Sequence, residues 1–160
     1  MNAYPRTQHP ARSIAQTVRP GVGRRLDWPR LPWAAPLGAA AAAAVSAVVF
    51  AVESDLGLID HTVKLPSMIG MNPASVESVA ITAMVVSLWG AIALAAVAAV
   101  AARPIRPFWI LSTIVLILSF ALPTTVTGPP LSMRVAMMVL HVATWGTSVS
   151  LLTTLARRSL

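Results

Sequence analysis

Residues 81–101 read ITAMVVSLWGAIALAAVAAVA, a run without a single charged side chain. At a rise of about 1.5 Å per residue, about 20 residues in a helix span a bilayer core of roughly 30 Å. The run is therefore long enough and apolar enough to cross a membrane. It predicts a transmembrane helix, and three further runs of this kind occur in the chain.

Apolar runs of similar length lie on both sides of residues 81–101. Including a helical turn that we expect to emerge above the membrane, the predicted spans are 31–52, 76–102, 107–126 and 134–155. The composition agrees, with 56% hydrophobic and 11% charged residues. Residues 31–158 are thus expected to form an all-α domain, a membrane four-helix bundle.

The third span is the one whose end is least regular. Pro123 lies inside it, and proline lacks the amide hydrogen that a continuing helix would use. Two interpretations remain open: either Pro123 kinks a longer helix, or the membrane end of this span is irregular.

The first 30 residues differ from everything that follows. Residues 1–30 are rich in arginine and proline and show almost no apolar periodicity, so they cannot bury a core. We expect a disordered basic tail. Between the first two spans, residues 53–72 hold most of the acidic side chains, and we expect them to form an outer loop.

The basic residues predict the orientation of the chain. Arginines crowd the tail, the turn at 103–106 and the C-terminus, whereas only Lys64 and Arg134 fall on the opposite side. By the positive-inside rule, both termini should face the cytoplasm in a multi-pass protein of the cell membrane. The net charge of +7 therefore reflects topology, so the expected partner is the lipid bilayer and not nucleic acid.

Residue types that are absent exclude several kinds of chemistry. The chain contains no cysteine, which rules out disulfides, thiol nucleophiles and iron–sulfur clusters in this chain. A haem held by two axial ligands needs two suitable side chains at similar depth, and among histidines only His141 lies within a span. The sequence therefore implies no cofactor and no metal site.

The candidate site is a polar layer around His141, because ionisable groups inside a bilayer are costly. Counting along the spans places Ser46, Ser87 and Ser119 at a similar depth, one on each other helix. We expect the imidazole to bond a serine hydroxyl, or the Ser119 carbonyl that Pro123 leaves free. Two roles remain open for this layer. It forms a small polar pocket that opens outward, or its neutral histidine only stabilises the bundle through hydrogen bonds between helices.

A second pair of polar residues lies at the outer ends of two spans. Glu77 and Arg134 are close enough in depth to form an ion pair across the outer mouth. Asn72, followed by Pro73, predicts the N-cap of the helix that carries Glu77.

Two patterns bear on how the helices associate. Arg30-Leu31-Pro32-Trp33 and Arg106-Pro107-Phe108-Trp109 open the first and third spans, while Trp-Gly pairs lie within the second and fourth, which suggests two tandem helical hairpins. Gly38, Ala42 and Ser46 repeat every four residues, a spacing that favours close helix packing. A homo-oligomer and a partner membrane protein are both left open.

Three short segments carry a family resemblance: 103–109 (RPIRPFW), 119–123 and 137–146, with His141 near the middle of the last. They resemble a family of uncharacterised small four-span membrane proteins of actinobacteria. The resemblance implies a location in the membrane but no activity, cofactor or partner.

The candidate functions are narrowed mainly by the charged and catalytic residues that the predicted spans lack. A transporter needs a charge within the membrane on its pathway, and these boundaries place no acidic residue deep in a span. One histidine with hydroxyls is also a poor catalytic set. We expect a non-enzymatic accessory or interaction protein; the alternatives are a small transporter or lipophilic-ligand carrier that uses the His141 layer and, as a weaker one, a membrane oxidoreductase.

Overall fold

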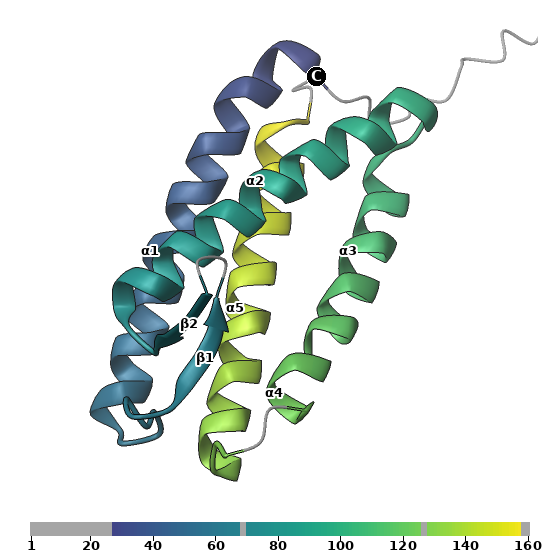
Figure 1. Ribbon diagram of the computed structural model, residues 1–160. Coiled ribbons are helices and arrows are strands. Elements are labelled where there is room, and N and C mark those ends of the chain that lie inside the picture. The colour runs from purple at the N-terminus through teal and green to yellow at the C-terminus, as the bar shows by residue number, and fades with distance from the viewer. Residues whose placement is uncertain (1–26, 68–69, 126–127, 158–160) are drawn as a thin grey trace, which may run out of the picture.

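The fold is an all-α four-helix bundle, as the sequence predicts, and a computed structural model describes residues 27–67, 70–125 and 128–157. Most of the expected basic tail, residues 1–26, lies outside the described residues. The elements shown in Figure 1 are a 3-10 turn η1 (Trp28–Arg30), α1 (Leu31–Asp55), β1 (Lys64–Ser67), β2 (Gly70–Pro73), α2 (Val76–Val100), α3 (Ile105–Ser119), α4 (Ala121–Thr125) and α5 (Leu131–Leu155).

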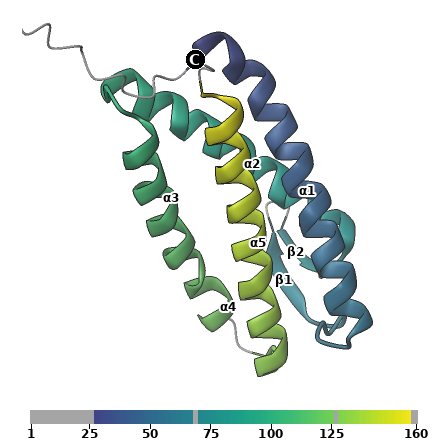
Figure 2. The same cartoon turned by 180° about the vertical axis from the view of Figure 1, so that it is seen from behind.

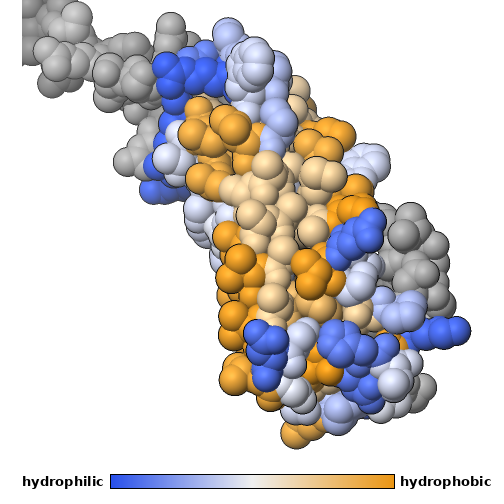
Figure 3. All heavy atoms as spheres, turned by 90° about the vertical axis from the view of Figure 1, so that its left-hand side faces the viewer, coloured by the Kyte–Doolittle hydropathy of each residue, from blue (hydrophilic) through white to orange (hydrophobic). Residues whose placement is uncertain are grey.

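Four helical stretches are long and apolar enough to cross a membrane. They are Trp28–Asp55, Val76–Val100, Ile105–Thr125 (α3 with α4) and Leu131–Leu155. Many large aliphatic side chains on them are exposed, and Figure 3 shows a predominantly apolar middle with hydrophilic side chains gathered at both ends. Such a surface suits lipid and not water, so the chain is an integral membrane protein.

The core forms where α1, α2 and α5 pack against one another. Small residues on α1 and α2 allow close approach, and Leu152 of α5, which is 0% exposed, fills the space that they leave. A Cβ atom built on Gly38 would lie 3.5 Å from the Leu152 side chain, and one built on Gly90 would lie 3.6 Å away. The small-residue pattern of α1 is thus a packing surface for α5.

Helix α3 stands apart from the other three helices, as Figures 1 and 2 both show. Within α3, all of whose residues are described, only Phe108 is buried, and it joins the core around Leu94 and Leu152. The Trp109 and Trp145 rings add an edge-to-face contact at 5.4 Å. Because α5 packs mainly on α1, its place differs from that in two self-contained hairpins, and an internal duplication stays a prediction.

The third span is interrupted one residue after Ser119. Helix α3 ends at Ser119, Phe120 is its C-cap, and the following helix α4 contains Pro123. Proline has no amide hydrogen to donate to the Ser119 carbonyl, so the regular ladder cannot continue. Of the two interpretations that the sequence left open, the structure agrees with the second. The membrane end of the span is irregular, because α3 and α4 are separate helices.

The connection between α1 and α2 departs from the expected loop. It contains an antiparallel hairpin in which Lys64 pairs with Pro73 and Ser67 with Gly70, and its first three expected residues belong to α1. The N-cap of α2 is Ser75, whose hydroxyl accepts a hydrogen bond from the Ser78 amide at 3.2 Å. The N-cap expected at Asn72 is therefore wrong, since Asn72 belongs to β2.

Helix α1 ends in a left-handed turn at Gly57, with φ of 68°. The Leu58 amide donates to the Glu53 carbonyl and the Gly57 amide to the Ser54 carbonyl, both at 2.9 Å. This is the Schellman arrangement, for which glycine is favoured because it adopts positive φ without a Cβ clash. It folds the chain back so that Leu58 lies beside the last turn of α1.

Candidate functional site

Two serines of the expected polar layer, Ser46 and Ser87, are buried and join helices, whereas Ser119 is half-buried. Ser46 of α1 bonds Thr144 of α5, and Ser87 of α2 bonds Ser148 of α5, each at 2.6 Å between oxygens. The Thr144 hydroxyl already donates to Leu140, so Ser46 is the donor to Thr144. These pairs fix the rotation of α5 against its neighbours.

His141 takes a different position from the one expected. Its Nδ1 donates to the Met137 carbonyl one turn earlier at 2.6 Å, and its ring meets Phe120 edge-on at 6.5 Å between centroids. Ser119 also bonds within its own helix, to the Leu116 carbonyl. Within the described part of the chain, no hydrogen bond joins His141 to Ser46, Ser87 or Ser119, so the expected imidazole–serine bond is not formed.

The ion pair expected at the outer mouth is not formed either. The Arg134 Nε donates to the Pro129 carbonyl at 3.1 Å, and Glu77 is exposed on the first turn of α2. Among described residues the salt bridge is Arg30–Asp27, at the opposite end of the bundle. The sequence prediction paired Glu77 with Arg134 only because their depths in the membrane are similar. In the structure, the Arg134 side chain instead hydrogen-bonds the segment that leads into α5.

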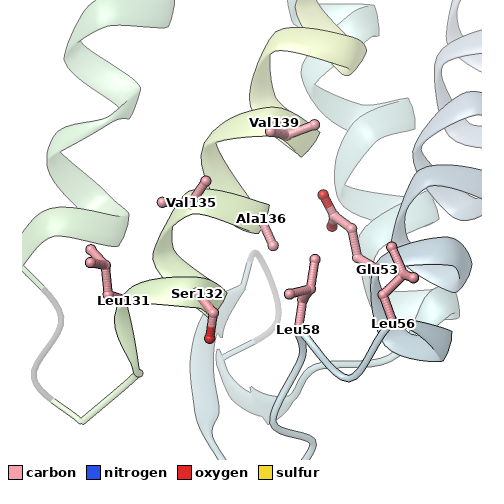
Figure 4. A pocket seen from close by; sticks show the side chains of 8 residues that line it. All are labelled: Glu53, Leu56, Leu58, Leu131, Ser132, Val135, Ala136 and Val139. Atoms are coloured by element: carbon pink, nitrogen blue, oxygen red, sulfur yellow. The ribbon is translucent and has the colours of Figure 1, made fainter.

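A buried carboxyl that the sequence analysis placed in the outer loop lies in the last turns of α1. Glu53 is 6% exposed, and its Oε2 atom is buried without a hydrogen-bond partner among the described residues. In Figure 4 the carboxyl points away from α1 toward α5, near Ala136 and Leu58. Assigning Glu53 to a solvated loop is therefore wrong, because α1 continues to Asp55.

The Glu53 side chain forms part of the wall of a hollow of about 610 Å³ between the end of α1 and the start of α5. We call this hollow the Glu53 groove; its lining, drawn in Figure 4, is Glu53, Leu56, Leu58, Leu131, Ser132, Val135, Ala136 and Val139. A neighbouring apolar hollow of about 350 Å³ shares Val135 and Val139 and continues along α5 to Ala143. The groove is thus an apolar site with one acidic group.

Other charged groups near this end of the bundle are engaged elsewhere. The pKa of Asp60 is lowered by hydrogen bonds from the Thr62 hydroxyl and the Thr62 backbone amide. The His61 Nδ1 donates to the Ala74 carbonyl, and the His61 ring packs edge-on against Phe50. No basic side chain is among the described residues that line the Glu53 groove.

The arrangement is suited to binding more than to catalysis. One carboxyl and one hydroxyl, Ser132, are the polar side chains of the groove, and no hydrogen bond joins these two described residues, so they do not form a nucleophile–base pair. No group of three or more histidine, cysteine, aspartate or glutamate side chains within the described ranges could hold a metal ion. An apolar hollow with a single charged group matches the composition of small-ligand sites.

The sequence did contain a signal for Glu53. The buried face of α1 follows Ala42, Ser46, Phe50 and Glu53, at spacings of four, four and three. This is the helical period, so Glu53 continues the packing face. Ending the span at residue 52 on hydropathy alone concealed this continuity.

A protein-family model matches most of the chain. The model of a family described as "Family of unknown function (DUF6069)" matches residues 27–159. Neither the curated proteins nor the solved structures contain a significant match.

Proposed function

Since the chain belongs to DUF6069, a family of unknown function, we propose its role from the geometry: a non-enzymatic membrane protein that binds a lipophilic ligand in the Glu53 groove. The observation that carries this proposal is the nine-tenths buried Glu53 carboxyl, with one unpaired oxygen, in an apolar hollow. Buried polar groups ordinarily have partners, and one without a partner calls for an explanation. A ligand bound in the groove would supply the missing partner.

The sequence allowed a lipophilic-ligand carrier that uses the His141 layer. In this proposal the ligand binds beside Glu53 instead. His141 bonds to its own helix, whereas Glu53 faces a hollow that is large enough for a small molecule. The accessory role expected from the sequence would instead require a second protein on the lipid-facing helices. The actinobacterial origin also stays a prediction from the resemblance.

Orientation is part of the proposal, because it decides from which side the ligand enters. Arg30, Arg103, Arg106 and Arg157 lie at the end of the bundle where the described chain begins and ends. We place this end in the cytoplasm by the positive-inside rule. The Glu53 groove then opens at the outer leaflet of the cell membrane.

Native mass spectrometry of the protein purified in mild detergent tests the proposal. We expect the wild-type chain to retain a small lipophilic molecule, and Val139→Trp to lose it because the indole fills the mouth of the groove. Val139 is 51% exposed, so the ring can be accommodated without disturbing the core.

The matched control is Val48→Trp, which adds the same ring to a lipid-facing position of α1 that is 64% exposed. This variant should retain the molecule. Equal retention by both variants would contradict the proposal, and an added protein subunit in place of a small molecule would support the accessory role instead.

A further inference from the structure

Resting on the proposed function, we propose that the ligand is a cationic amphiphile, with an ammonium-type head against the Glu53 carboxyl and an apolar tail along α5. The two parts of this inference come from separate observations. The head group is assigned from the charges around the groove, and the tail from the shape of the adjoining hollow.

The charge argument begins with the missing partner of Glu53. Its carboxyl lies among aliphatic side chains, where a negative charge is costly unless a positive group or a proton accompanies it. The described residues near the groove provide no such cation: Arg134 of α5 bonds the Pro129 carbonyl, and His61 of the connection bonds the Ala74 carbonyl. A positively charged ligand would complete the site, whereas an anionic one would be repelled.

The remaining charged side chains at this end point to the same conclusion. Asp55 on the same helix, and Asp60 and Lys64 in the connection to α2, are exposed, as is Glu77 on α2. None of these four is among the residues that line the Glu53 groove. The acidic residues among them add negative potential at the entrance, which favours approach of a cation.

The tail is assigned from a continuous apolar surface on α5. The Glu53 groove reaches from Leu131 to Val139, and the second hollow continues from Val135 to Ala143. At about 1.5 Å per residue this surface is roughly 18 Å long, enough for an alkyl chain. Its lipid-facing side lets a tail enter from the bilayer while the head stays near the outer interface.

The test uses three probes with one decyl tail and different heads: decylammonium, whose N–H groups can donate to the Glu53 carboxylate, decanol and decyl sulfate. Each is titrated into the full-length protein in phosphatidylcholine nanodiscs, with empty nanodiscs as the baseline. We expect saturable binding of decylammonium above the baseline and at least about tenfold weaker binding of the other two, because a charge-assisted hydrogen bond is worth about a factor of ten or more.

Variants separate the head from the tail. Glu53→Gln should weaken the cation at least about tenfold while leaving decanol unchanged, and Glu53→Asp should retain part of the cation binding. Asp55→Asn, at an exposed acid two residues away, is the matched control and should bind the cation within about twofold of the wild type, because water screens an exposed charge. Val142→Trp should weaken the cation by obstructing the tail, since Val142 lines the second hollow.

The outcomes distinguish this inference from the proposed function. If decanol binds as tightly as the cation and Glu53→Gln changes neither, the cationic head is wrong while ligand binding stands. If Val142→Trp binds the cation like the wild type, the tail assignment is wrong. If no probe binds saturably to a folded wild-type protein that also retains no small molecule, both proposals fail.

Discussion

Leu152→Ala should lower the free energy of unfolding by about 3 kcal/mol, as large-to-small changes at fully buried sites do. Leu152 is 0% exposed and fills the space between Gly38 of α1 and Gly90 of α2. Alanine would leave a cavity at the junction of three helices, and the glycines have no side chains with which to fill it. Steric-trapping measurements of reversible unfolding in bicelles give this free energy directly.

Leu155→Ala is the matched control for that measurement. Leu155 lies one turn further along α5 and is 37% exposed, so the same change should alter the free energy of unfolding by at most about 0.5 kcal/mol. If the two variants lose equal stability, the packing of α5 between α1 and α2 is wrong.

The second large effect concerns orientation and is all-or-none. The chain contains no cysteine, so single cysteines report their own positions. In intact cells that express the protein, an impermeant maleimide should label Asp55→Cys and leave Ala102→Cys unlabelled, because the two exposed positions lie at opposite ends of the bundle. Both should be labelled once the membrane is permeabilised. The reverse pattern would place the Glu53 groove on the cytoplasmic side.

The fold was predictable because long apolar runs leave little choice inside a bilayer. Each run must satisfy its own backbone hydrogen bonds, so helices follow directly from runs such as 81–101. The hairpin of β1 and β2 was not predicted, since it depends on pairing within a connection that carries no apolar run. The C-terminal turn of α1 was missed although Gly57 is a typical signal for it.

The candidate site was harder to predict because depth along a helix does not give rotation about its axis. Ser46 and His141 were matched in depth, yet Ser46 meets Thr144, less than one turn further along α5. His141 instead faces Phe120. For Glu53, hydropathy ended the span too early, whereas the period of the buried face of α1 includes it. Helix rotation is set by packing, which the pattern of small and polar residues reports better than hydropathy does.

The proposed function requires that the Glu53 carboxyl faces an apolar groove that is open to a lipophilic molecule. Dicyclohexylcarbodiimide tests it, because this reagent enters from the membrane and adds to a protonated carboxyl. The carboxyl proton passes to a carbodiimide nitrogen, the oxygen bonds to the central carbon, and the product rearranges to a stable N-acylurea where water is excluded.

Peptide mass spectrometry after this treatment should find the adduct on Glu53 and not on Asp55, which is exposed to water. Labelling of Glu53 should fall in Val139→Trp, whose indole blocks the groove, and stay at the wild-type level in Val48→Trp. An unmodified Glu53 in the wild-type protein, or equal labelling in the two tryptophan variants, would contradict the proposed function.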